Sequence, residues 1–164
     1  EDKKVGVMEK YSGIDIANYF LKHSYDLSSY LTQKKLHKLM FLAYAWYLYA
    51  FNKPNNLSNR LFSNTFQGWV HGPVLREIYP CFSNFGYQPI MVRDNISFQE
   101  LTSDDKAFLD KVYETYEDYS ADELEALTHS CNSWKESRQG LTPYEVGKNP
   151  LKDELIYQDV EEIL

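Results

Sequence analysis

The chain has 164 residues, of which 43% are hydrophobic and 16% aromatic, with 14 tyrosines and 9 phenylalanines. This composition is typical of one folded domain and excludes a disordered chain. The net charge of −7 argues against broad contact with nucleic acid, which requires a basic surface. The many tyrosines fit two interpretations: rings packed in the core with solvated hydroxyls, or aromatic groups at a protein interface.

The cysteines and the N-terminal residues indicate in which cellular compartment the chain is expected. Cys81 and Cys131 lie far apart and form no CxxC motif, so we expect free thiols in a reducing cytoplasm. Residues 1–10 carry many charges and lack the apolar core of a signal peptide. We expect residues 1–10 to be a charged N-terminal segment, either disordered or not native, and residues 11–164 to form the domain. The uncharged stretch 39–51 is too short to span a bilayer, so no membrane contact is expected.

Two helices are predicted in the N-terminal third of the chain. The first covers residues 14–22, with a broad apolar face and Asp15 near its start. The second follows Thr32, a good N-cap, and extends to about residue 51. Its apolar residues, among them Leu36 and Leu39, recur every three or four positions, and its second half is apolar all round. We expect it to be the central helix.

A small β element is predicted next, near residues 62–71 and 90–98. Residues 62–70 alternate as a short strand does, and Gly72-Pro73 then break the pattern. Pro73 is suited to the first position of a helix, so residues 73–85 are predicted helical, with a kink or early end at Pro80.

The C-terminal part is predicted to be helical with one irregular stretch. Thr102 or Ser103 caps one helix, and the capping-box spacing of Ser120 and Glu123 starts a shorter one. Residues 130–147 are expected to be irregular, and a last short helix to cover about residues 158–164. The predicted fold is therefore a single compact helical domain, mainly α and α+β at most.

No pattern of catalytic or ligand-binding residues stands out. The chain has no GxGxxG, no GK[ST] and no HExxH. His129 and Cys131 are spaced i, i+2, which on a helix points them to different sides and makes a poor metal site. A nucleophilic pair of Cys131 with His71 lacks a third orienting group. We therefore predict no enzyme activity, no metal and no cofactor.

Two segments combine tryptophan and histidine with polar neighbours. Residues 67–74 hold Trp69 and His71 at a junction between elements, and residues 127–135 hold His129 and Trp134. Trp134 either covers the edge of the core, with its N–H on a carbonyl, or anchors a partner. The two histidines either bind each other or the backbone, or face a partner.

Four segments together resemble one family, the Panacea antitoxin domain of the SocA-like group, which also includes phage-associated GepA-like proteins. The resemblance covers residues 14–164. Residues 16–21 resemble the opening helix of the family. Residues 31–41 resemble its "LT…KLQKLLY" signature, with His37 where glutamine is usual. Residues 66–77 with Tyr79 resemble "W…GPV…E.Y". Residues 118–124, 127–129 and 134–135 resemble "YSA.EL…LTH…PW", with Ser133 where proline is common.

This resemblance implies an antitoxin that neutralises a cognate protein toxin, usually encoded by a neighbouring gene, through direct contact. Some members carry an added DNA-binding domain, and we expect none here. The candidate partner-binding residues are Trp69, His71, Arg76, Glu77, His129 and Trp134. The residues expected to be structural are Gly72, Pro73, Leu36, Leu39, Tyr79 and Thr128.

Other functions stay open beside this one. A proteolytic adaptor would deliver a toxin or another protein to a protease, and so change its level as well as its activity. A nucleic-acid-binding regulator would depend on the cluster Lys34, Lys35 and Lys38, although direct nucleic-acid binding is not expected. A homo-oligomer also stays open.

Overall fold

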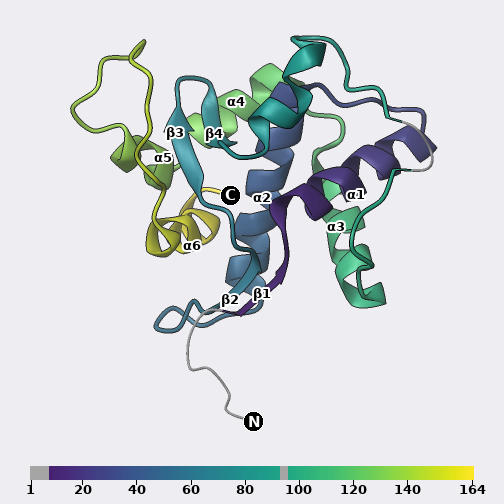
Figure 1. The fold of residues 1–164 in the computed structure, drawn as a ribbon. Helices are drawn as coiled ribbons and strands as arrows, with labels where there is room; N and C mark the ends of the chain where they lie inside the picture. The colour runs from purple at the N-terminus through teal and green to yellow at the C-terminus, as the bar shows by residue number, and fades with distance from the viewer. Residues whose placement is uncertain (1–7, 93–95) are drawn as a thin grey trace.

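Helix α2 (Gln33–Ala50) runs through the middle of the computed structural model, which describes residues 8–92 and 96–164 (Figure 1). Thr32 caps it as expected, because its Oγ1 accepts a hydrogen bond from the Lys35 N–H at 3.2 Å. Buried residues lie on every side of the helix, Leu36 and Leu39 among them, and α1, α3, α4, α6, β2 and β4 all contact it. The expected central helix is confirmed.

Helices α1 (Gly13–Asp26) and α3 (Ser103–Tyr116) lie beside each other on one side of α2 (Figure 1). Ser12 and Asp15 form a capping box at the start of α1, and the Thr102 hydroxyl caps α3. Strand β1 (Met8–Tyr11) pairs in parallel with β2 (Asn59–Phe62), a pairing the sequence pattern did not indicate. The expected boundary at residue 10 thus falls inside a strand, and residues 1–7 of the expected N-terminal segment lie outside the described residues.

A β-hairpin replaces the start of the helix expected at residues 73–85. Strand β3 (Phe66–Trp69) pairs antiparallel with β4 (Gly72–Leu75), so Pro73 lies in a strand opposite Gly68. All four residues of β4 are buried, and a short run buried on both faces has the same apolar pattern as a buried helix. Only the end of the expected helix is helical, as the 3₁₀ segment η1 (Tyr79–Phe85), with Pro80 at its start.

The second expected β segment, residues 90–98, contains no strand in its described parts, residues 90–92 and 96–98. The chain nevertheless touches the helix start there, because Pro89 forms an isolated bridge with Thr32 and the Ile90 N–H donates to the Leu31 carbonyl at 2.7 Å. This single bridge attaches the segment to the start of α2 but does not continue into a pair of strands.

The C-terminal part contains α4 (Ala121–His129), α5 (Asn132–Ser137) and α6 (Asp153–Glu162). The capping box of Ser120 and Glu123 is present, with N–H···O distances of 3.0 and 2.8 Å. Residues 130–147 are not wholly irregular, because α5 lies within them. The buried Asp159 carboxylate of α6 accepts from the N–H groups of Asn132 and Ser133, at 2.8 and 3.2 Å, and so caps α5 from another helix. Helix α6 begins five residues earlier than the expected segment 158–164.

The loop after α5 is held by Arg138, a buried side chain. Its guanidinium donates to three backbone carbonyls, those of Gly68, Thr142 and Glu145, at 2.8, 3.0 and 2.7 Å. The arginine thereby ties residues 138–145 to strand β3.

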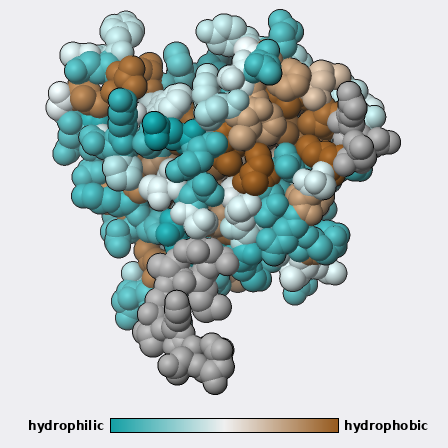
Figure 2. Space-filling view, viewed as in Figure 1, coloured by the Kyte–Doolittle hydropathy of each residue, from teal (hydrophilic) through white to brown (hydrophobic). Residues whose placement is uncertain are grey.

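The expected fold class is confirmed: mainly α, with a small β component, around one core. Figure 2 shows exposed hydrophobic side chains gathered over η1 and α1, with a smaller group over the loop after α5, while most of the face is hydrophilic. Within residues 8–92 and 96–164, no helix has both the length and the apolar character that crossing a bilayer requires.

Candidate functional site

The hairpin turn between β3 and β4 presents Val70 and His71 at its tip. Gly72 has φ +124, a conformation that L side chains rarely adopt. A Cβ at Gly72 would also lie 3.0 Å from the Thr128 hydroxyl and 3.2 Å from Cε of Lys38. Glycine therefore lets the turn lie directly against α4 and α2, which brings the hairpin over the side chains of both helices.

The second sequence segment meets this turn from α4 and α5. The Trp134 indole N–H donates to the Trp69 carbonyl at 2.8 Å, and the His129 Nε2–H donates to the Val70 carbonyl at 3.0 Å. The His129 and Trp134 rings stack, with centroids 4.0 Å apart. Burial lowers the pKa of His129 and so favours its neutral ring, and Nε2 carries a proton because the Val70 carbonyl can only accept. Both side chains hydrogen-bond to the backbone of the hairpin, as expected for residues that hold the turn.

His71 faces an acidic group on α4 and remains open to solvent. Its Nδ1 lies 3.1 Å from a carboxylate oxygen of Glu125, while 71% of its side chain is exposed. The Glu125 carboxylate also forms an ion pair with Nζ of Lys34 at 2.6 Å, and it lies 3.8 Å from Nε2 of His129. Burial raises the pKa of Glu125, but the hydrogen bonds from Lys34 and His71 outweigh it and leave the pKa below its usual value. Glu125 is therefore a charged centre shared by three side chains.

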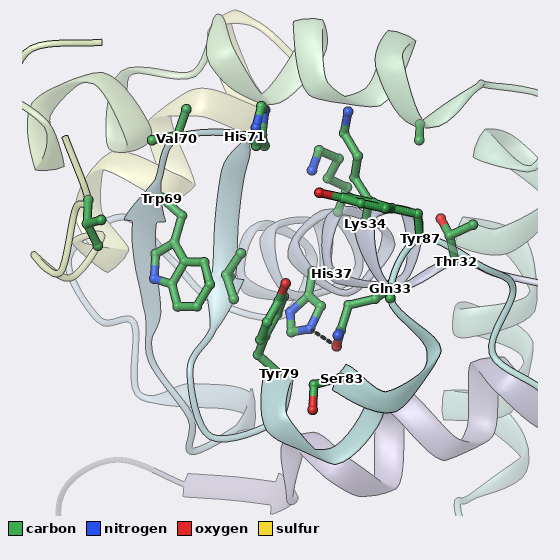
Figure 3. A pocket seen from close by; sticks show the side chains of 15 residues that line it. Thr32, Gln33, Lys34, His37, Trp69, Val70, His71, Tyr79, Ser83 and Tyr87 are labelled. Carbon is green, nitrogen blue, oxygen red and sulfur yellow. Dashed lines mark hydrogen bonds between the residues drawn. The ribbon is translucent and has the colours of Figure 1, made fainter. Parts of the chain in front are cut away.

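Beneath the hairpin lies a cavity of about 670 Å³ that opens to solvent (Figure 3). This volume is in the range that small ligands or inserted side chains fill. In Figure 3, Trp69 of β3 and Tyr79 of η1 stand side by side on one wall, and their ring centroids are 5.0 Å apart. The lining comes from α2 and its cap (Thr32, Gln33, Lys34, His37, Lys38), from the hairpin (Trp69, Val70, His71, Val74), from η1 and the turn after it (Tyr79, Ser83, Gly86, Tyr87), and from Ala121 and Val146.

His37 and Gln33 form the polar part of the cavity floor. The Leu75 N–H donates to Nδ1 of His37 at 3.2 Å, so the proton of the neutral ring lies on Nε2, which donates to Oε1 of Gln33 at 3.1 Å. Burial lowers the pKa of His37 to about 3, so the ring is neutral under ordinary conditions. The histidine thus links α2 to strand β4 and fixes the orientation of the Gln33 amide.

The three lysines of the α2 N-terminal half have different environments. Lys34 pairs with Asp122 at 3.0 Å as well as with Glu125, and Lys35 donates to the Glu117 carbonyl at 2.6 Å. Lys38 is only 2% exposed, and burial lowers its pKa to about 8. They do not form the exposed basic patch that the nucleic-acid alternative requires.

The expected partner-binding residues do not all lie at this cavity. Trp69 and His71 line it, and His129 and Trp134 support the turn that carries them. Arg76 and Glu77 are exposed outside the lining, and Glu77 accepts a 3.3 Å hydrogen bond from Asn64 instead. The residues expected to be structural fall into two groups. Leu36, Leu39, Gly72, Pro73 and Thr128 are buried, whereas Tyr79 lines the cavity.

Most of the lining residues were not among the site residues predicted from the sequence, and Gln33, His37, Lys38 and Tyr87 are examples. A signal for the first three was present, because Gln33 and His37, like Lys34 and Lys38, are spaced i, i+4 on one helix that is otherwise largely apolar. Polar residues that share a face of a central helix have to be buried together or to line an opening.

Cys131 lacks the surroundings of a nucleophile. It is buried and its Sγ contacts the Leu127 carbonyl at 3.7 Å. Burial raises the pKa of this thiol to about 12, so the reactive thiolate does not form near neutral pH. In the part of the chain that the structure describes, no three histidine, cysteine or acidic side chains gather as metal ligands would.

Comparison with known proteins identifies one family. The family model described as antitoxin SocA-like, Panacea domain matches residues 36–135, which is more than half of the chain. These residues include most of α2, the hairpin, η1, α3, α4 and the start of α5, and therefore most of the cavity lining. No curated protein and no solved structure gives a significant match.

Proposed function

The chain belongs to the antitoxin SocA-like, Panacea domain family, and from this premise we propose that it neutralises a cognate protein toxin by binding it directly. The toxin gene is expected beside the gene of this chain. The proposal concerns the mode of action and the binding surface, which the family name does not specify.

The observation that carries the proposal is the cavity beneath the hairpin with its exposed apolar edge. Tyr87 is 96% exposed and Val146 is 71% exposed, and both line the cavity. Large side chains exposed together around a hollow are typical of protein-binding surfaces, and aromatic residues filling pockets supply most of the binding energy at such surfaces. Trp69 and His71 form the hairpin side of this surface.

The site residues divide into two roles under this proposal. Trp69 and His71 contact the toxin, because both line an opening to solvent. His129 and Trp134 position the turn through hydrogen bonds to the carbonyls of Val70 and Trp69. Arg76 and Glu77 contact the toxin only if the interface extends beyond the cavity.

A pair of matched tyrosine variants tests the surface. Tyr87→Ala removes an almost fully exposed ring from the cavity edge, and Tyr144→Ala removes a ring that is 88% exposed outside the lining. We expect Tyr87→Ala to weaken toxin binding about tenfold and Tyr144→Ala to leave it unchanged. Binding is measured by calorimetry with the purified product of the neighbouring reading frame. Equal affinity of both variants and the wild type would place the interface elsewhere.

A second measurement separates direct neutralisation from proteolytic delivery. The neighbouring product is expressed with and without this chain, and its activity is also assayed with purified components and no protease. Direct neutralisation predicts full inhibition in the purified system. An adaptor predicts no inhibition there and a lower toxin level in cells. A neighbour that is harmless when expressed alone would contradict the antitoxin function itself.

A further inference from the structure

Lys38 is a buried cation that has no direct partner among the residues that the structure describes. Its side chain is almost wholly enclosed between α2 and the hairpin turn, and Nζ lies 3.3 Å from the position that a Cβ on Gly72 would take. Within residues 8–92 and 96–164, its ammonium makes no hydrogen bond and no ion pair. Buried charges are normally paired, since an unpaired one lowers stability considerably.

The carboxylates that face Lys38 are already engaged by other groups. Asp122 and Glu125 of α4 act on the ammonium from a distance, but both pair with Lys34, at 3.0 and 2.6 Å. Glu125 also binds His71 at 3.1 Å. Lys34 and the two carboxylates therefore satisfy one another, and the charge of Lys38 is left over.

Lys38 belongs to the lining of the cavity, so an entering group comes close to its side chain. The rest of the lining is mostly apolar or aromatic, with Trp69, Val74 and Tyr79 among its residues. A buried positive charge in a lining that is otherwise mostly apolar or aromatic is complementary to a carboxylate carried on an apolar stem. In such a site the Lys38 charge would gain its missing partner, and the walls would exclude water from the pair.

We propose that the cavity receives a carboxylate of the bound toxin, from an acidic side chain or the chain terminus, and that Lys38 pairs with it. This inference rests on the proposed function and adds the chemistry of the contact. A protein is the favoured source of the carboxylate, because the exposed lining residues Tyr87 and Val146 add apolar surface that a single small anion would not cover. Charge complementarity at one buried point fixes the register of the toxin on the surface.

The first experiment measures toxin binding with charge variants. Lys38→Met keeps the length of the side chain and removes its charge, and Lys38→Arg keeps the charge. As a control, Lys53→Met removes an exposed lysine in the turn after the C-terminal end of α2. We expect Lys38→Met to weaken binding about tenfold or more, Lys38→Arg to restore much of the loss, and Lys53→Met to match the wild type. Thermal unfolding of each variant verifies that it is folded.

The second experiment needs no toxin. The chain is titrated with 3-phenylpropionate, with 3-phenylpropanamide and with inorganic phosphate, while amide NMR shifts are recorded for the cavity residues. We expect saturable shifts with the carboxylate alone, and none in Lys38→Met. Because the Lys38 ammonium loses its proton near pH 8, the carboxylate should bind about tenfold more weakly at pH 9 than at pH 7.

The outcomes separate this inference from the proposed function. If toxin binds wild type and Lys38→Met equally and no probe binds, the carboxylate contact is wrong and direct neutralisation stands. If the carboxylate probe binds but the toxin does not, the proposed function fails and the cavity is a site for a free anion, which also overturns the toxin as its source. If phosphate binds as well as the carboxylate, the apolar stem has no role and the inference is wrong.

Discussion

Replacing Lys38 by methionine should stabilise the fold, although the residue lies in the central helix α2. The lysine is 2% exposed, and burial lowers its pKa from the ordinary value of 10.5 to about 8. Methionine has a similar length and no charge, so it fills the same space between α2 and the hairpin without the desolvation cost.

The magnitude follows from the pKa difference. The native state binds the lysine proton less tightly than the unfolded state, so the cost of the charge is fully present below pH 8 and is lost as the pH rises from 8 to 10.5. A difference of this size corresponds to about 3 kcal/mol at pH 7 and about 2 kcal/mol at pH 9. We therefore expect Lys38→Met to unfold at higher urea, with an advantage that shrinks as the pH rises.

Urea unfolding of the wild type and Lys38→Met at pH 7, 8 and 9 measures this advantage directly. The comparison between the two proteins cancels the titration of the many tyrosines, which both share. An advantage that does not change with pH would show that the effect comes from packing and not from the buried charge. A variant less stable than the wild type at pH 7 would refute the reasoning, since it would mean that the ammonium is paired in the native protein.

Three further predictions concern the hairpin, the cavity floor and the net charge. Trp134→Phe leaves the Trp69 carbonyl without its 2.8 Å donor, so urea unfolding should show a loss of about 1–2 kcal/mol; no loss would mean that water replaces the indole. His37, with its pKa lowered from 6.5 to about 3, binds a proton only on unfolding, so stability should fall by about 2 kcal/mol from pH 7 to pH 5. That part of the loss should be absent in His37→Gln, and an identical acid profile would contradict the assignment. Finally, a basic toxin should associate more slowly with this chain of net charge −7 as salt is raised, and a stopped-flow rate independent of salt would exclude electrostatic steering.

The elements that could be predicted are those whose ends are determined by neighbouring residues. Thr32 caps α2, and Ser120 with Glu123 caps α4, through hydrogen bonds that span three residues. Such caps are visible in the sequence because donor and acceptor lie next to each other in the chain. The central position of α2 could also be predicted, since a helix with apolar side chains on all faces has no face suited to solvent.

The elements that could not be predicted depend on distant partners. Helix α5 starts where the Asp159 carboxylate, 27 residues from Asn132, supplies the cap that the local sequence lacks. Strand β4 has the apolar pattern of a helix, and only its pairing with β3 makes it a strand. Both errors come from tertiary contacts that override local preference.

Only part of the candidate site could be predicted from the sequence, for a related reason. Trp69 and His71 stand out because their residue types are rare and their neighbours break the chain, and the structure brings both to the cavity. Lys38 does not stand out, because a lysine next to Lys34 and Lys35 has the pattern of a solvated helix face. Its burial arises when Gly72 brings the hairpin down on α2, a contact between segments more than thirty residues apart.

The bonds of Arg138 allow the cavity edge to vary in sequence while its scaffold stays the same. The guanidinium binds only main-chain carbonyls, and every residue type offers those. Substitutions at Thr142, Tyr144 or Val146 would leave this anchor intact and change what the loop displays, whereas a substitution at Glu145 would also remove the hydrogen bond that its carboxylate accepts from the Thr142 N–H. Gly147 must stay a glycine, because a side chain there would collide with the Gly68 carbonyl. The loop beside the cavity is therefore a place where new binding preferences can arise at little cost to folding.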